Sequence, residues 1–360
     1  MSNKLKIVLT GGGTAGSVMP LLAIYEGFKN RNIPAEFLFV GTEKGMEKEL
    51  VKTYDINFKS ISAGKLRRYL SLKNITDALK VAEGFFAARN ILKQFKPQAV
   101  VSAGGFVAVP VIWAAYSLKI PCLIHQQDFE KGLANKLTQK PATKITVTFE
   151  KSLLEFPRKK VVLIGNPVRP EILRGIKEKA IKIFSLKKNL PTLLILGGGT
   201  GALKINQEIN KILIDLVGFC QIIHLTGQGK GVTDFEHENY HPYELLTDKM
   251  KEALAVADLV ISRAGLSTLT ELAALAKPAI IIPIFKSHQE KNAAYFEKEH
   301  AVLVIRENIL HHELLLTTIK GLLSNPNKLN ELGQNIKKLD RPEALDKIIE
   351  IILEIKKPPF

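Results

Sequence analysis

Two glycine-rich segments are the first candidates for chemistry in this sequence of 360 residues. Residues 11–16 (Gly-Gly-Gly-Thr-Ala-Gly) and 197–202 (Gly-Gly-Gly-Thr-Gly-Ala) each follow a short apolar run and precede a helical pattern. Backbone N–H groups in such a turn, together with the positive end of a helix, bind phosphate. The Lys-Ser or Lys-Thr of a nucleoside-triphosphate loop follows neither segment. A tight strand-to-helix turn without a ligand is the alternative that either segment alone leaves open.

A second constellation lies in residues 262–271, which follow an apolar run and open a helical pattern. Ser267 and Thr268 are expected at the helix N-terminus, where hydroxyls and free N–H groups bind a diphosphate. Glu271, one turn further on, can accept hydrogen bonds from a diol such as a ribose. A capping box, in which the glutamate bonds back to the start of its own helix, fits the same spacing.

Two amide side chains form a third candidate beyond the next apolar run. Gln289 and Asn292 stand three residues apart at an expected helix start, after the buried stretch 281–283. Residues at this spacing share one helix face. Uncharged amides there suit hydrogen bonding to sugar hydroxyls, whereas an ordinary surface pair is the alternative.

The elements that must position these residues alternate between apolar runs and helical stretches, over a length that suits two α/β domains. The expected strands are residues 4–10, 37–40, 99–102, 122–125, 193–196, 221–225, 259–262 and 279–283. Such alternation indicates parallel sheets, whose ligands bind at the carboxyl ends of the strands. We therefore predict two doubly wound Rossmann-like domains, residues 1–165 and 166–340, and a C-terminal helix in 341–360 that packs back across the joint.

Charge is distributed unevenly along the chain, whose net charge is +16. Residues 1–165 hold 25 Lys and Arg against 12 Asp and Glu, and the remainder holds 26 against 23. A basic half indicates one polyanionic partner, either nucleic acid or an anionic membrane surface. No apolar run approaches the roughly 18 residues of a membrane span. The apolar run Leu5–Leu9 is too short for a secretory signal, and Cys122 and Cys220 lack any disulfide or metal-site pattern, so we expect a cytosolic protein.

Taken together, these segments resemble the MurG family, N-acetylglucosaminyltransferases of glycosyltransferase family 28. The segments that carry the resemblance are residues 12–20, 39–47, 62–67, 104–110, 125–135, 165–169, 197–206, 257–271 and 289–293. The resemblance implies the GT-B fold, two Rossmann-like domains with parallel sheets facing across a cleft. It also implies inverting transfer of N-acetylglucosamine from UDP-GlcNAc to undecaprenyl-diphospho-N-acetylmuramoyl-pentapeptide (lipid I), giving lipid II in peptidoglycan biosynthesis. No cofactor and no bound metal are implied.

The resemblance also assigns roles to individual residues. Glu271 would bind the ribose, residues 266–268 the diphosphate, and the two amides of the third candidate the sugar. Arg169 and the backbone near Thr247 would lie close to the uracil, and residues 14–16 would also meet the acceptor diphosphate. The complete donor-binding set expected is Thr14, Ala15, Gly16, Asp128, Arg169, Gly199, Thr247, Leu266, Ser267, Thr268, Leu269, Thr270, Glu271, Gln289 and Asn292.

One departure from the family pattern concerns the general base. Ser17 stands where the family has a histidine, and a free serine cannot act as a base near neutral pH. Asp128, which replaces a family amide, is our first candidate for the catalytic base, and His125 is the second unless it serves as a structural hydrogen-bonder. Three interpretations follow: an active transferase, a catalytically weakened scaffold that binds UDP-sugar and lipid, or a related transferase with another lipid acceptor.

Membrane docking is the last implication of the resemblance. The family binds the cytoplasmic face of the bacterial plasma membrane peripherally, through a basic and apolar patch of its N-terminal domain. The expected patch comprises Lys65, Arg67, Arg68, Lys73, Phe85 and Phe86. Cations beside aromatic side chains fit an interfacial site, although a solvated basic helix is the alternative. Nucleic acid is not expected as a partner, because no recognised binding motif accompanies the charge.

Overall fold

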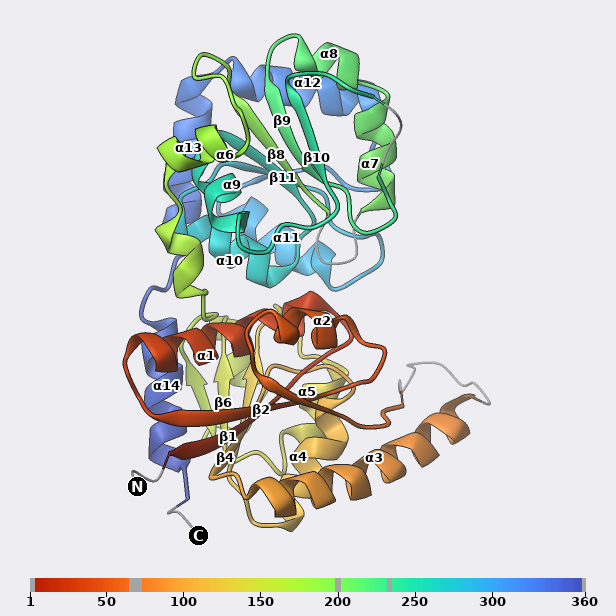
Figure 1. The fold of residues 1–360 in the computed structure, drawn as a ribbon, viewed down its shortest axis with the longest axis vertical. Coiled ribbons are helices and arrows are strands. Elements are labelled where there is room, and N and C mark those ends of the chain that lie inside the picture. The colour runs from red at the N-terminus through yellow and green to blue at the C-terminus, as the bar shows by residue number, and fades with distance from the viewer. Residues whose placement is uncertain (1–3, 65–72, 198–201, 232–234, 358–360) are drawn as a thin grey trace. The chain divides into compact units, whose positions relative to one another are not determined.

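The computed structural model describes residues 4–64, 73–197, 202–231 and 235–357, with side chains from residue 79 in the second range (Figure 1). The chain divides into two compact units. Unit 1 comprises Met1–Arg169 and Arg341–Phe360, and unit 2 comprises Pro170–Asp340. The C-terminal segment therefore belongs to the first unit. Within the described ranges, no helix combines the length and the apolar composition needed to cross a membrane.

Within the described residues of unit 1, seven parallel strands form one sheet in the order β3-β2-β1-β4-β5-β6-β7. Its elements are β1 (Leu5–Thr10), η1 (Ala15–Ser17), α1 (Met19–Asn30), β2 (Ala35–Gly41), α2 (Met46–Lys52), β3 (Asn57–Ser60), α3 (Lys73–Phe95), β4 (Ala99–Ser102), α4 (Ala108–Ser117), β5 (Cys122–Gln126), α5 (Leu133–Thr138), β6 (Lys144–Val147), η2 (Glu150–Leu154), β7 (Val161–Leu163) and α14 (Ala344–Ile355). Ile7 and Leu9 face one core and Val8 the other, because helices cover both faces of the sheet.

Helix α14 completes unit 1 from the far end of the chain. Ile348, Ile349 and Ile352 are fully buried in the same core as β1 and α1. A Cβ on Gly27 of α1 would lie 2.6 Å from Cδ1 of Ile349, so glycine is what permits this close helix contact. A helix was expected in residues 341–360, and α14 lies in that range and belongs to unit 1.

In the described part of unit 2, six parallel strands have the order β10-β9-β8-β11-β12-β13. Its elements are η3 (Pro170–Arg174), α6 (Lys177–Ile183), β8 (Thr192–Leu196), α7 (Leu203–Asn210), α8 (Leu213–Val217), β9 (Gln221–Leu225), β10 (Tyr240–Tyr243), α9 (Met250–Val256), β11 (Leu259–Ser262), α10 (Leu266–Ala274), β12 (Ala279–Ile281), α11 (Gln289–Lys298), β13 (Leu303–Val304), α12 (His312–Leu323) and α13 (Pro326–Lys337). In both sheets the strand order reverses beside the strand that carries the glycine segment, which is where doubly wound folds bind ligands. The predicted α/β class is confirmed.

Candidate functional site

The first glycine segment leaves β1 and meets the loop after β4. Gly105 has φ +84°, and a Cβ there would lie only 2.2 Å from the carbonyl oxygen of Gly12. Only glycine allows this backbone contact. This contact holds the glycine turn in place. The predicted residues Thr14, Ala15 and Gly16 belong to this turn, immediately before α1.

The buried carboxylate of Glu47 also stabilises this turn. Glu47 accepts hydrogen bonds from the Gly13 N–H (3.2 Å), the Thr42 N–H (2.9 Å) and the Thr42 hydroxyl (2.7 Å). It thereby joins the loops after β1 and β2. The sequence indicated Glu47 only as part of a motif and gave it no role, because a glutamate in a charge-rich helical stretch normally faces water.

Ser17 is built into the glycine turn. Its side chain is buried, and its hydroxyl lies 3.1 Å from the carbonyl oxygens of both Gly12 and Thr14, to which it can donate. The hydroxyl hydrogen is thus directed toward the backbone. The expectation that Ser17 does not itself act as a base agrees with this geometry.

His125 lies at the end of β5 and is fully buried. In the neutral ring, Nε2–H donates to Oδ1 of Asn166 and Nδ1 accepts from the hydroxyl of Thr146, both at 3.0 Å. Burial lowers the pKa of His125 to about 4, against the opposing effect of the hydrogen bond to Asn166. This geometry favours the structural alternative for His125, because both ring nitrogens are engaged away from solvent.

Asp128 lies two residues beyond β5, in a loop whose shape is set by Gln126. The Gln126 amide donates to the carbonyl oxygens of Asp128 (2.8 Å) and Glu130 (2.7 Å). Its Oε1 accepts from Gly132 N–H (3.2 Å) and from the Asn135 amide (2.9 Å). Asp128 itself is half-buried and lies in the loop at the carboxyl end of β5. The sequence did not assign this supporting role to Gln126.

In unit 2, α10 supplies a helix N-terminus at the carboxyl end of β11. The helix begins at Leu266 after Gly265, so the backbone N–H groups of Leu266, Ser267 and Thr268 belong to its first turn. Glu271 is 8% exposed and stands six residues after the N-cap position. A capping-box glutamate occupies the third helical position, so this position does not fit the capping-box alternative.

The two amides of α11 behave differently. Gln289 is half-buried, and its Oε1 accepts from the Ile284 N–H at 3.2 Å. Asn292 is fully buried and donates to the Ala264 carbonyl at 3.2 Å. Asn292 thus ties α11 to the loop before α10, whereas Gln289 is only half-buried; that both amides contact the sugar stays a prediction.

The other predicted donor residues are spread along the chain. Leu269 is fully buried, and the Thr270 hydroxyl donates to carbonyls of its own helix at 3.0 Å. Thr247 is exposed in the loop before α9. Arg169 belongs to unit 1, where its Nη1 lies 3.4 Å from the hydroxyl of Tyr54. Gly199 lies outside the described residues.

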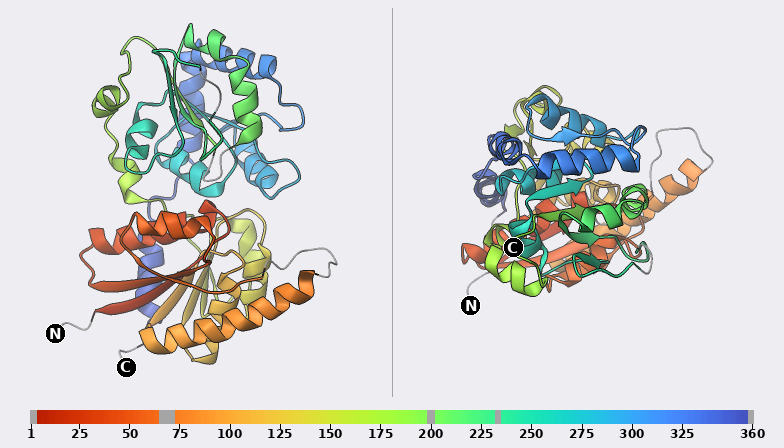
Figure 2. Two further views of the ribbon diagram at one scale, coloured as in Figure 1. Left: turned by 45° about the vertical axis from the view of Figure 1, so that its right-hand side comes forward. Right: turned by 90° about the horizontal axis from the view of Figure 1, so that it is seen from above.

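Three residues of the expected membrane patch, Lys73, Phe85 and Phe86, belong to α3, which lies alongside α4 (Figure 2). Phe86 is 68% exposed, whereas Phe85 is half-buried against the core that α4 shares, so only one of the two predicted aromatic residues is on the surface. Leu79 is as exposed as Phe86, and Trp113 and Tyr116 of α4 are also exposed. Lys65, Arg67 and Arg68 lie outside the described residues, and Lys73 begins α3.

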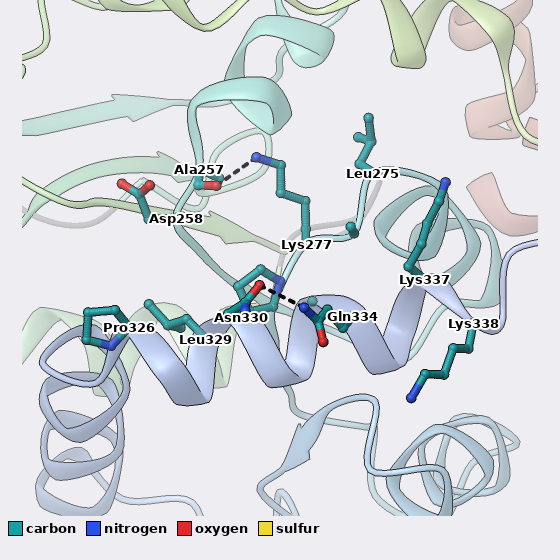
Figure 3. A pocket seen from close by; sticks show the side chains of 13 residues that line it. Ala257, Asp258, Leu275, Lys277, Pro326, Leu329, Asn330, Gln334, Lys337 and Lys338 are labelled. Atoms are coloured by element: carbon teal, nitrogen blue, oxygen red, sulfur yellow. Dashed lines mark hydrogen bonds between the residues drawn. The ribbon is translucent and has the colours of Figure 1, made fainter.

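A hollow of about 660 Å³ lies at the opposite edge of the unit 2 sheet, before β11 and β12 (Figure 3). There Lys277 donates to the carbonyls of Ala255 and Ala257, both at 2.9 Å. Lys337 donates to the Ala274 carbonyl at 2.8 Å. Both lysines thus satisfy the carbonyl ends of helices, which is a structural role. Within the described residues, no group of three or more His, Cys, Asp or Glu side chains is arranged to hold a metal ion.

Comparison with known proteins connects the two units to one family. Residues 7–147 match the glycosyltransferase family 28 N-terminal domain, and residues 192–348 match its C-terminal domain. A UDP-N-acetylglucosamine–N-acetylmuramyl-(pentapeptide) pyrophosphoryl-undecaprenol N-acetylglucosamine transferase of Lachnoclostridium phytofermentans is 41% identical, over 98% of this chain and 99% of the relative. The protein of the same name from Lachnospira eligens is 37% identical over the same shares.

Solved structures agree with this relationship. The crystal structure of Acinetobacter baumannii MurG superposes with a TM-score of 0.71 at 25% identity, over 98% of this chain and 99% of that one. A UDP-GlcNAc 2-epimerase from Neisseria meningitidis, at 16% identity, shares the fold with a TM-score of 0.67, over 98% of this chain and 100% of that one. The fold is GT-B, and the resemblance seen in the sequence is confirmed. The chain belongs to glycosyltransferase family 28.

Proposed function

We propose that this protein transfers N-acetylglucosamine from UDP-GlcNAc to lipid I, with inversion at the anomeric carbon, to give lipid II. The observation that carries the proposal is the helix start at Leu266–Thr268 followed by the buried carboxylate of Glu271. This arrangement occurs in a chain 41% identical to a relative named for that transfer. Unit 2 would bind the donor, and unit 1 the acceptor and the membrane.

The donor chemistry follows from the geometry of α10. Its first-turn N–H groups and helix dipole favour the negative charge that develops on the departing diphosphate. Glu271 would accept hydrogen bonds from the ribose hydroxyls, and the free amide N–H groups of Gln289 would donate to the sugar. Stabilisation by fixed dipoles costs no reorganisation during the reaction.

Deprotonation of the acceptor hydroxyl requires a base, and we propose Asp128. The Ser17 hydroxyl faces backbone carbonyls, and His125 is engaged through both ring nitrogens. Gln126 instead supports the loop that carries the Asp128 carboxylate. His125 then acts through Asn166, by holding the loop that follows β7.

We further propose that the protein acts at the cytoplasmic face of the bacterial plasma membrane. The lipid substrate named for the relatives requires access to a membrane. Exposed Leu79 and Phe86 on α3, and the excess of Lys and Arg in residues 1–165, suit an anionic interface.

The decisive experiment is transfer of labelled GlcNAc from UDP-GlcNAc to a short-chain lipid I analogue, with analysis of the product anomer. We expect β-linked product, at a rate that EDTA does not change. Binding of UDP-GlcNAc without transfer would support the scaffold interpretation. Transfer to another lipid, such as diacylglycerol, in place of the lipid I analogue would support the third interpretation.

A further inference from the structure

Glu307, in the loop after β13, connects the donor-side loops of unit 2. Its Oε1 pairs with the guanidinium of Arg263, which directly follows β11, and its Oε2 accepts the Phe285 N–H at 2.9 Å. Lys204, at the start of α7, donates to the Glu307 carbonyl oxygen. The side chains of Arg263 and Glu307 are only 11% and 14% exposed. One residue thus contacts the start of α7 and the loops that follow β11 and β12.

Residues 282–285, the first part of the segment between β12 and α11, are held at both ends by this pair. Arg263 Nη1 donates to the Ile282 carbonyl at 3.1 Å, while Glu307 accepts from the Phe285 N–H. Between them, the Ile284 N–H donates to Oε1 of Gln289. Because residues 282–285 are held in place, the Ile284 N–H that donates to the Gln289 side chain is also held in place.

The orientation of Gln289 has a chemical consequence. Because its Oε1 accepts from the Ile284 N–H, the orientation of the amide is fixed, and its N–H groups can donate to hydroxyl oxygens of a ligand. Burial alone would raise the pKa of Glu307, but the Phe285 N–H, Arg263 and Lys204 outweigh it and hold the pKa below its ordinary value. The carboxylate is consequently charged at neutral pH, and the ion pair with Arg263 is intact.

We infer that Glu307 is a positioning residue that determines recognition of the donor's sugar: with Arg263 it fixes residues 282–285 and so orients Gln289. This inference rests on the proposed function, because it takes a nucleotide sugar as the ligand of unit 2. It separates two parts of donor recognition. The diphosphate and ribose would meet α10, whereas the sugar would depend on residues 282–285, which Glu307 and Arg263 hold.

The test compares UDP with UDP-GlcNAc, using calorimetry on the full chain. Glu307→Ala removes both the ion pair and the acceptor for Phe285 N–H, and Glu307→Gln removes only the charge. We expect Glu307→Ala to weaken UDP-GlcNAc binding by about tenfold or more, as loss of a positioned hydrogen bond would, and UDP binding by less than about threefold. Glu307→Gln should fall between wild type and Glu307→Ala. Retained UDP binding also shows that each variant is folded.

The matched control is Glu297→Gln, which breaks the neighbouring ion pair with Arg306, an exposed pair outside the donor loops. It should change neither affinity. If the Glu307 variants weaken UDP and UDP-GlcNAc equally, or weaken neither, the inference is wrong while the proposed function stands. If wild-type protein does not bind UDP-GlcNAc, the inference and the proposed function fail together.

Discussion

At the residue scale, the catalytic base is sought in the loop after β5, because Ser17 is not expected to act as a base. We predict that Asp128→Asn lowers kcat by about tenfold or more, because a positioned base contributes typically 10²–10⁴ in rate. UDP-GlcNAc affinity should change little, the pattern of a group that acts in the transition state. Steady-state kinetics with the lipid I analogue and calorimetry with the donor measure the two quantities.

Glu130→Gln is the control for that prediction. It removes a carboxylate from the same loop, whose backbone Gln126 holds at both Asp128 and Glu130. Its kcat should remain near that of wild type. Full activity of Asp128→Asn would remove the assignment and require another base.

Glu271 carries the second prediction at this scale. Glu271→Ala should weaken UDP-GlcNAc binding by roughly 1–3 kcal/mol, because a charged acceptor for the ribose hydroxyls is lost. Glu313→Ala, an exposed glutamate in the first turn of α12, should have no effect. Unchanged affinity in Glu271→Ala, or equally tight binding of ADP-glucose by wild type, would contradict the proposed role.

At the element scale, α3 presents two adjacent phenylalanines with opposite surroundings. Phe86→Ser should weaken sedimentation with anionic vesicles and leave the melting temperature unchanged, because that ring is mostly exposed. Phe85→Ala should instead lower the stability of unit 1, by roughly half of the about 3–5 kcal/mol lost when a fully buried phenylalanine is truncated. Vesicle co-sedimentation at increasing salt and thermal unfolding measure the two effects.

The vesicle measurement on the Phe86 variant can also contradict the membrane prediction. If Phe86→Ser binds vesicles as wild type does, the apolar part of the membrane site lies elsewhere. Reversal of Arg67, Arg68 and Lys73 to glutamate tests the basic part separately, and it should abolish sedimentation while donor affinity stays intact. Each cation near such a surface contributes about 1 kcal/mol.

The elements were largely predictable from the sequence, and the contacts between them were not. Buried strands such as β1 and β8 can be recognised in the sequence, because each is an apolar run followed by glycine. The edge strand β3 has no buried residue, and β13 has two residues, so neither carries an apolar signal. Strand order and the place of α14 depend on packing over the whole chain.

Some candidate site residues can be recognised from the local sequence, and others only from contacts with distant residues. Candidates on one helix, such as Ser267 and Glu271 of α10, can be proposed from local spacing. Glu47 and Glu307 cannot, because their partners Gly13 and Arg263 lie 34 and 44 residues away in sequence. A buried carboxylate is recognisable only once its distant N–H partners are known.

At the scale of the whole molecule, each unit contains one buried histidine near the end of an interior strand, hydrogen-bonded to an asparagine. His224 of β9 lies 3.1 Å from both Asn206 Oδ1 and the Tyr240 hydroxyl, as His125 bonds Asn166 and Thr146 in unit 1. Asn206 in turn donates to the carbonyls of Thr226 and Lys230. Each histidine–asparagine pair therefore secures a loop at the carboxyl edge of its sheet.

This duplication predicts how the stability of both units depends on pH. Burial lowers the pKa of His125 and of His224 from 6.5 to about 4, so the folded protein keeps both rings neutral while the unfolded chain protonates them. The stabilisation is complete above pH 6.5 and is lost as the pH falls toward 4, by about 3 kcal/mol for each histidine. Denaturant unfolding between pH 7 and pH 4.5 should show this decline.

His125→Gln and His224→Gln should be less stable at pH 7 but should lose less stability on acidification, because glutamine does not titrate. His237→Gln, at an exposed position, should retain the full wild-type decline. Equal acid sensitivity in wild type and in both buried-histidine variants would show that other groups, such as paired carboxylates, govern acid unfolding.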